Sequence, residues 1–169
     1  MKWLLDHAIV PKVIFNGSKI MSLKIHAKYR IKFRDSLNFV PMSLAKWAAS
    51  CALQEQKTHF PHDMNGPDYW GREIPFPDRH HYGYDTMSRA ERRTFLKFYR
   101  KERRRCRNVF DVNRTLAEYC NQDTKTLRVC YQQFRELFFE LSDGICPFSC
   151  AVTLPGMQNI FDQILNISD

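Results

Sequence analysis

The sequence has no apolar run long enough to cross a membrane, and it has no internal repeat or low-complexity tract. The chain begins with Met1-Lys2-Trp3-Leu4-Leu5-Asp6, which is too short and too soon charged for a secretory signal peptide. These absences predict an intracellular protein in a reducing compartment, with no membrane partner. The sequence does not distinguish between the nucleus, the mitochondrion and a virus factory as the compartment.

Paired metal-binding cysteines are also missing, because none of the six Cys forms a Cys-x-x-Cys pair. The nearest approach to a zinc set is His59 and His62 together with Cys146 and Cys150. We interpret the cysteines as reduced thiols, most of them structural. A zinc-stabilised interaction domain built on those four residues is kept as an alternative.

The composition that is present predicts one packed domain with an anionic partner. In 169 residues, 44% are hydrophobic and 14% aromatic, which argues for a globule with a core. The formal net charge is +8. Such an excess favours nucleic acid as the partner.

Local signals predict strands first and helices afterwards. Val13-Ile14-Phe15 and residues 20–25 flank Asn16-Gly17, which predicts a hairpin with a tight turn. Tyr29, Ile31 and Phe33 alternate with Arg30, Lys32 and Arg34, which predicts a third strand with a basic face. That face is either solvated surface or a phosphate contact. The expected later elements are helices starting at Ser43 and Ser88, a loop over 54–85, and a partly helical segment after Pro147 that is interrupted at Pro155-Gly156.

A run of basic residues ends the helix that starts at Ser88. It reads Arg100-Lys-Glu-Arg-Arg-Arg105. One interpretation is a solvated helix end, where cations suit the helix dipole. The others are a nucleic-acid patch or a nuclear import signal.

The stretch from 109 to 143 predicts a long helix that stops at Asp143-Gly144. Its apolar stripe is expected to be buried and comprises Leu116, Cys120, Leu127, Cys130, Phe134, Leu137 and Leu141. Asp123 occupies a slot in this stripe, and Tyr119 lies one turn before it on the same side. A carboxylate in an apolar stripe must be protonated, paired with a cation such as Arg128, or bound to a metal.

Five segments, taken in order, resemble protein-primed family B DNA polymerases, the enzymes of linear plasmids, some viruses and Polinton-type transposons. The segments are Lys12-Val-Ile-Phe-Asn-Gly-Ser-Lys-Ile-Met21, Asp35-Ser-Leu-Asn-Phe-Val-Pro-Met-Ser-Leu-Ala-Lys46, Phe60-Pro-His62, Asp85-Thr-Met-Ser88 and Glu118-Tyr-Cys-Asn-Gln-Asp123. The resemblance implies a mixed α/β fold. It would be an incomplete ribonuclease-H-like 3′–5′ exonuclease domain, with a three-stranded antiparallel meander followed by helices.

The resemblance also implies roles for catalytic residues. Asp123 would be a metal ligand, Tyr119 would orient the attacking water, and Lys57 would assist near the scissile phosphate. The metal would be Mg²⁺ or Mn²⁺, bound only in the complete parent domain, and no ion is expected to bind tightly here. Two-metal hydrolysis needs several converging carboxylates.

For DNA binding, the resemblance implies that Ser36 and Leu37 contact the single-stranded primer end and that Phe60 helps to hold the frayed strand. The implied partners are single-stranded DNA and, in the parent family, a terminal priming protein.

The sequence departs from the family pattern in its carboxylates. The first motif, Asp-x-Glu, and the second, an Asn and an Asp, are not among the 169 residues, and neither is the polymerase palm. We therefore predict a partial exonuclease domain over residues 1–148 and the start of the segment toward the polymerase region over 149–169, inactive by itself. The alternative is a non-catalytic nucleic-acid-binding module derived from that domain.

Overall fold

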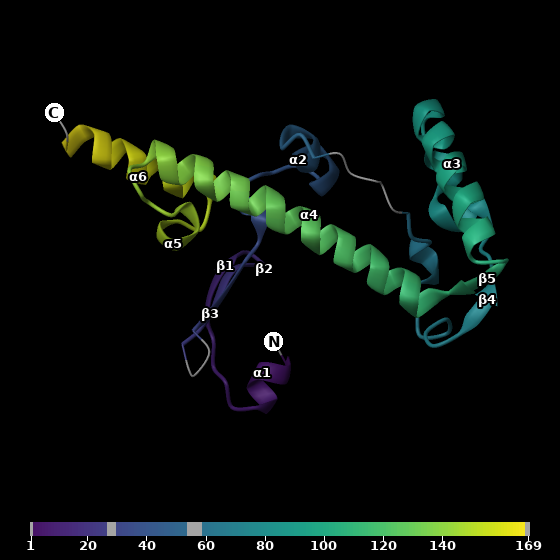
Figure 1. The fold of residues 1–169 in the computed structure, drawn as a ribbon. Coiled ribbons are helices and arrows are strands. Elements are labelled where there is room, and N and C mark those ends of the chain that lie inside the picture. The colour runs from purple at the N-terminus through teal and green to yellow at the C-terminus, as the bar shows by residue number, and fades with distance from the viewer. Residues whose placement is uncertain (1, 27–29, 54–58, 168–169) are drawn as a thin grey trace. The chain divides into compact units, whose positions relative to one another are not determined.

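The computed structural model describes residues 2–26, 30–53 and 59–167, which form two compact units. Unit 1 comprises residues 1–52 and 129–169, and unit 2 comprises residues 53–128. Helix α4 (Val112–Leu141) begins in unit 2 and ends in unit 1 (Figure 1). The chain is mixed α/β, with a three-stranded antiparallel meander followed by helices, as the sequence predicted.

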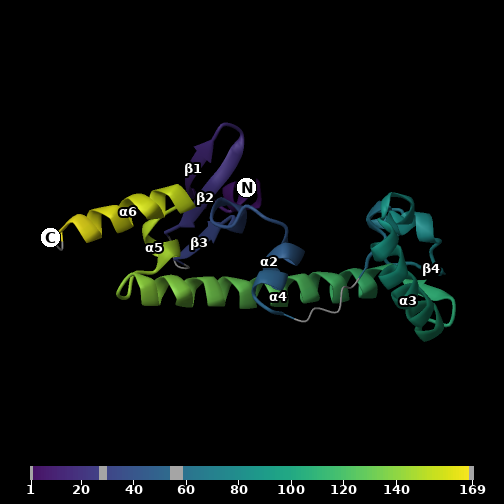
Figure 2. The same cartoon turned by 90° about the horizontal axis from the view of Figure 1, so that it is seen from above.

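The meander of unit 1 follows the short helix α1 (Lys2–Asp6). Its strands are β1 (Lys12–Asn16), β2 (Lys19–Ile25) and β3 (Ile31–Arg34), in the order β1-β2-β3 (Figure 2). Val13 pairs with Leu23 and Leu23 pairs with Phe33, so these apolar side chains share one face. Tyr29, expected in the third strand, lies outside the described residues.

The hairpin turn lies one residue later than predicted. Asn16 pairs with Lys19, so the two loop residues are Gly17 and Ser18. Gly17 has a φ of 59°, whereas Ser18 does not have a positive φ. A positive φ at the first loop residue and not at the second is the pattern of a type II′ turn, which favours Gly at that place.

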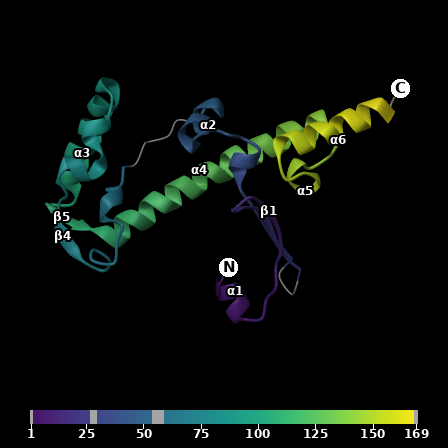
Figure 3. The same cartoon turned by 180° about the vertical axis from the view of Figure 1, so that it is seen from behind.

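Helices and a 3-10 turn complete unit 1. The 3-10 turn η1 (Ser36–Asn38) precedes α2 (Leu44–Ser50), and the Ser43 side chain accepts a hydrogen bond from the Lys46 amide at the predicted start of α2. After α4 the chain continues into α5 (Pro147–Cys150) and α6 (Leu154–Ile167) (Figure 3). Pro155 and Gly156 open α6 and do not interrupt a helix, because proline is tolerated in a first helical turn.

Unit 2 contains α3 (Arg89–Arg105), which starts with the predicted capping box of Ser88 and Glu91. The expected loop is less irregular than predicted. It contains the 3-10 turns η2 (His62–Met64), η3 (Arg79–Tyr82) and η4 (Tyr84–Thr86), and strand β4 (Glu73–Pro75). Strand β4 pairs with β5 (Val109–Asp111), so the stretch expected to be wholly helical begins with a strand. The core holds Phe60, Phe110 and Val112 in one cluster and Tyr82, Phe95 and Tyr99 in another.

Helix α4 is not buried along the whole predicted stripe. Cys130 is fully buried, but Cys120 is exposed and Leu127, Leu137 and Leu141 are 37%, 54% and 66% exposed. A helix of 30 residues is about 45 Å long, which exceeds what the core of one small unit covers. The predicted C-cap is present, because Asp143 and Gly144 both have positive φ and the Gly144 amide donates to the carbonyl of Phe139.

Candidate functional site

Tyr119 and Asp123 lie one turn apart on α4, and both side chains are half-buried. Burial raises the pKa of the Tyr119 phenol, and the negative charge of Asp123 and a hydrogen bond between the two side chains raise it further. The two groups therefore interact, which is possible because residues four apart are neighbours on a helix surface. The phenol stays protonated at neutral pH and can donate a hydrogen bond.

The alternative of an ion-paired Asp123 finds no support in the part of the chain that the structure describes. No Lys, Arg or His in residues 2–26, 30–53 and 59–167 forms a salt bridge with Asp123, Arg128 included. The interaction that the structure does give this carboxylate is the one with Tyr119.

Two rings from the segment Phe60-Pro61-His62 contact the Tyr119 ring. The ring centroid of Phe60 lies 6.0 Å from that of Tyr119, and the His62 centroid lies 5.4 Å from it in an edge-on arrangement. Phe60 is 2% exposed and packs into the cluster with Phe110 and Val112. Phe60 therefore packs against Tyr119 from the core side. Direct contact of Phe60 with DNA stays a prediction. His62 was not expected beside Tyr119, because only its spacing to His59 stood out in the sequence.

Lys57 lies outside the described residues. Ser36 and Leu37 belong to unit 1, where they form η1. Asp35 accepts a hydrogen bond from the Leu37 amide and lies 2.9 Å from the Lys19 ammonium group. The hydrogen bond from Lys19, followed by that from the Leu37 amide, lowers the pKa of Asp35. This bend holds Ser36 half-buried and leaves Leu37 51% exposed.

The described residues supply few metal ligands around Asp123. Asp111 accepts a hydrogen bond from the Arg114 amide and so caps the start of α4. Across the described ranges, no three His, Cys, Asp or Glu side chains gather in a way that could hold a metal ion. Since a two-metal centre needs several converging carboxylates, the residues described here do not fit one.

Two arginines of the predicted basic features make internal contacts. Arg34, expected on the basic face of the third strand, donates to the carbonyl of Ala151. Arg105, at the end of α3, contacts Glu102 and Glu118. The hydrogen bond that Arg105 donates to Glu102 is the main reason that the pKa of Arg105 is raised. Part of the basic run therefore stabilises the chain's own structure.

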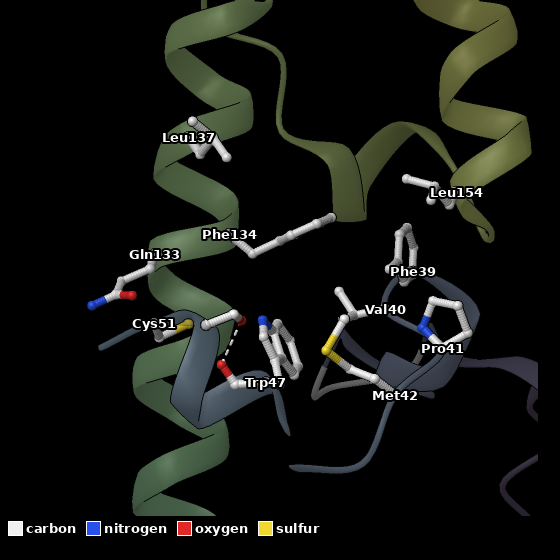
Figure 4. Close-up of a pocket in the computed structure, with 11 residues that line it drawn as sticks. Phe39, Val40, Pro41, Met42, Trp47, Cys51, Gln133, Phe134, Leu137 and Leu154 are labelled. Atoms are coloured by element: carbon white, nitrogen blue, oxygen red, sulfur yellow. Dashed lines mark hydrogen bonds between the residues drawn. The ribbon is translucent and has the colours of Figure 1, made fainter. Parts of the chain in front are cut away.

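Unit 1 also contains an open apolar groove of about 420 Å³. Figure 4 shows Trp47 and Phe134 beside one another in its wall, and their ring centroids are 6.2 Å apart. Ser50, a further lining residue, donates a 2.7 Å hydrogen bond to the Trp47 carbonyl. The aromatic and aliphatic lining offers packing surface, but it does not bring together the charged groups that hydrolysis requires.

The chain matches the family of DNA polymerases type B, organellar and viral, over residues 1–168, and it belongs to this family. Membership relates it to DNA polymerases and DNA replication, with DNA as the general class of partner. Neither a curated protein nor a solved structure matches the chain. Among the described residues, no helix is both long and apolar enough to span a membrane.

Proposed function

We propose that this chain is the middle and end of the 3′–5′ proofreading exonuclease region of a protein-primed family B DNA polymerase. The observation that carries the proposal is the interacting pair of Tyr119 and Asp123 on one helix of a chain that belongs to the type B family. A phenol next to a carboxylate can orient a water molecule for attack on a phosphodiester while the carboxylate holds a metal ion.

The proposed partner is single-stranded DNA at a primer terminus. Leu37 on η1 offers an exposed apolar contact for a base, and the net charge of +8 attracts the phosphates. In the parent enzyme, a terminal protein would supply the priming group. The boundary between residues 1–148 and 149–169 stays a prediction, as do the roles of Lys57, Ser36 and Phe60.

In this proposal the chain binds DNA and does not hydrolyse it. Asp123 alone cannot hold two metal ions, and the described residues supply no group of further ligands beside it. Mg²⁺ or Mn²⁺ would therefore act only once the two upstream carboxylate motifs are joined to the chain. The metal ion would then be bound by Asp123, the attacking water oriented by Tyr119, and the scissile phosphate contacted by Lys57.

The test compares the chain with a longer one that carries the coding sequence upstream of Met1. With Mg²⁺ and a labelled single strand, we expect background trimming by the chain and clear trimming by a longer protein that contains Asp-x-Glu and a following Asn and Asp. Asp123→Ala should abolish that trimming, whereas Glu140→Gln, an exposed change on the same helix, should leave it intact. Mg²⁺-dependent trimming by the short chain that Asp123→Ala removes would contradict the proposed inactivity.

A second candidate function is a non-catalytic nucleic-acid-binding module derived from the same domain. The observation that favours it is the strong basic excess of the meander, in a chain whose described residues contain no group of three candidate metal ligands. If the upstream coding sequence lacks the two motifs and the chain still binds single strands with a steep dependence on salt, this function replaces the first.

A further inference from the structure

The net positive charge of the chain is concentrated in the meander. Residues 12–34 contain seven of the 26 Lys and Arg but none of the 18 Asp and Glu, so they supply seven of the eight net positive charges. A charge excess on one small sheet produces a local field that a charge spread over the chain would not.

The register of the sheet places three of these cations directly opposite one another. Lys12 pairs with Lys24, and Lys24 pairs with Lys32, so the three side chains form one row across β1, β2 and β3. We call them the lysine row. Lys12 and Lys32 are exposed and Lys24 is half-buried. Like charges directly opposite in a sheet repel and destabilise it, so an anion bound beside the row would offset the repulsion and stabilise the sheet.

The row has no internal counter-charge among the residues that the structure describes. Within the described residues, Lys12, Lys24 and Lys32 form no salt bridge and no side-chain hydrogen bond, whereas Lys19 of the same hairpin pairs with Asp35. Further along the same face, Ser22 is buried and Arg34 donates to Ala151. The lysine row is thus the open part of the basic face.

The exposed rings of the sheet lie on its other face. The register shift between Ile14 and Phe15 places the extra residue on β2, so side chains still alternate along β1 and Phe15 lies on the side of Val13 and Phe33. The lysine row therefore offers contacts to phosphates and not an aromatic ring for base stacking.

We propose that the lysine row binds consecutive phosphates of single-stranded nucleic acid. Three neighbouring strands span about 10 Å, a length that fits phosphates adjacent along one strand. The choice of nucleic acid as the partner rests on the proposed function, while the location of the contact rests on the register and exposure of these three side chains.

The test uses the whole chain and a fluorescent oligothymidine of about 15 nucleotides, titrated over a range of salt concentrations. We expect the triple change Lys12→Gln, Lys24→Gln, Lys32→Gln to weaken binding about tenfold to a hundredfold and to reduce the salt slope by about 2. The control changes Lys46, Lys97 and Lys125 to Gln, which removes the same charge from exposed positions elsewhere. It should weaken binding by less than about threefold. Far-ultraviolet circular dichroism of each variant verifies the fold.

The outcomes separate the inference from the proposed function. If the native chain binds the oligonucleotide at low salt and the lysine-row variant binds as tightly as its control, the lysine row is not the contact. Single-strand binding by the chain would still stand. A native chain that binds no oligonucleotide at low salt overturns both. Tighter binding to vesicles of anionic lipid than to the oligonucleotide, lost in the same variant, overturns the inference in favour of a membrane surface.

Discussion

The rings of Tyr131 and Phe148 stack with their centroids 3.8 Å apart, which fixes α5 against the second half of α4. Phe148 is 6% exposed and also meets Phe39 edge-on, with the centroids 4.8 Å apart. Because Phe39 follows η1, this cluster connects the bend that carries Ser36 and Leu37 to the core of unit 1.

Phe148→Ala should therefore destabilise unit 1 strongly. Deleting a buried Phe ring costs about 3–5 kcal/mol of the free energy of unfolding. The control is Phe139→Ala, because Phe139 lies on α4 and is 45% exposed, and its cost should be below about 1 kcal/mol. Urea unfolding followed by circular dichroism measures both, and equal midpoints for the two variants would contradict the role of this stack.

Tyr82→Phe is expected to stabilise unit 2. The Tyr82 ring packs on Phe95 with the centroids 5.3 Å apart, and its buried hydroxyl has no hydrogen-bond partner among the described residues. Removing an unsatisfied buried hydroxyl should raise the free energy of unfolding by about 1 kcal/mol. In contrast, Tyr99→Phe should lower it by about 1 kcal/mol, because the Tyr99 hydroxyl donates to the carbonyl of Pro77. Thermal melts of the two variants should shift in opposite directions.

The stability of the chain should fall in alkaline solution. Burial is the first cause that raises the pKa of Tyr82 and also that of Tyr99 above their ordinary value of 10.0. The unfolded phenols lose their protons first as the pH rises, which favours unfolding. This contribution is complete below about pH 10 and is lost as the pH rises toward the folded pKa values. Urea midpoints on either side of pH 10 should show the fall, and Tyr82→Phe should make it shallower.

Cys146 should be more reactive than Cys106. Burial opposes ionisation of Cys146, but hydrogen bonds from Ser149, Arg135 and two backbone amides outweigh it and lower the pKa of this thiol below 9.0. Burial, followed by the charge of Glu102, raises the pKa of Cys106. Because the thiolate is the nucleophile, iodoacetamide near neutral pH should label Cys146 first, as peptide mass spectrometry can measure. Faster labelling of Cys106 would contradict this.

Sequence patterns predicted the elements that depend on neighbouring residues. The caps at Ser43 and Ser88 and the stop at Asp143-Gly144 were all found, because each depends on hydrogen bonds within a few residues. The pairing of β4 with β5 was missed. It joins strands of three residues that are far apart in the chain, and Pro75 obscures the strand signal in β4.

The same distinction applies to the candidate site and to the basic face. Tyr119 and Asp123 were predicted to lie on the same side of one helix because four residues separate them. The lysine row was missed because Lys12 and Lys24 join Lys32 only through the register of three strands. The exposed positions of α4 could not be predicted either, since periodicity shows which side chains share a face and not which part of that face another segment covers.

The interaction of Tyr119 with Asp123 can be measured without any enzymatic activity. Asp123→Asn removes a negative charge that raises the pKa of the phenol, so that pKa should fall while burial keeps it above the ordinary value. Ultraviolet absorbance of tyrosinate, recorded against pH, gives the titration, and subtracting the curve of Tyr119→Phe isolates this phenol. Glu140→Gln, on the same helix, should leave the curve unchanged. If Asp123→Asn leaves it unchanged as well, the two groups do not interact, and the observation that carries the proposed exonuclease site is lost.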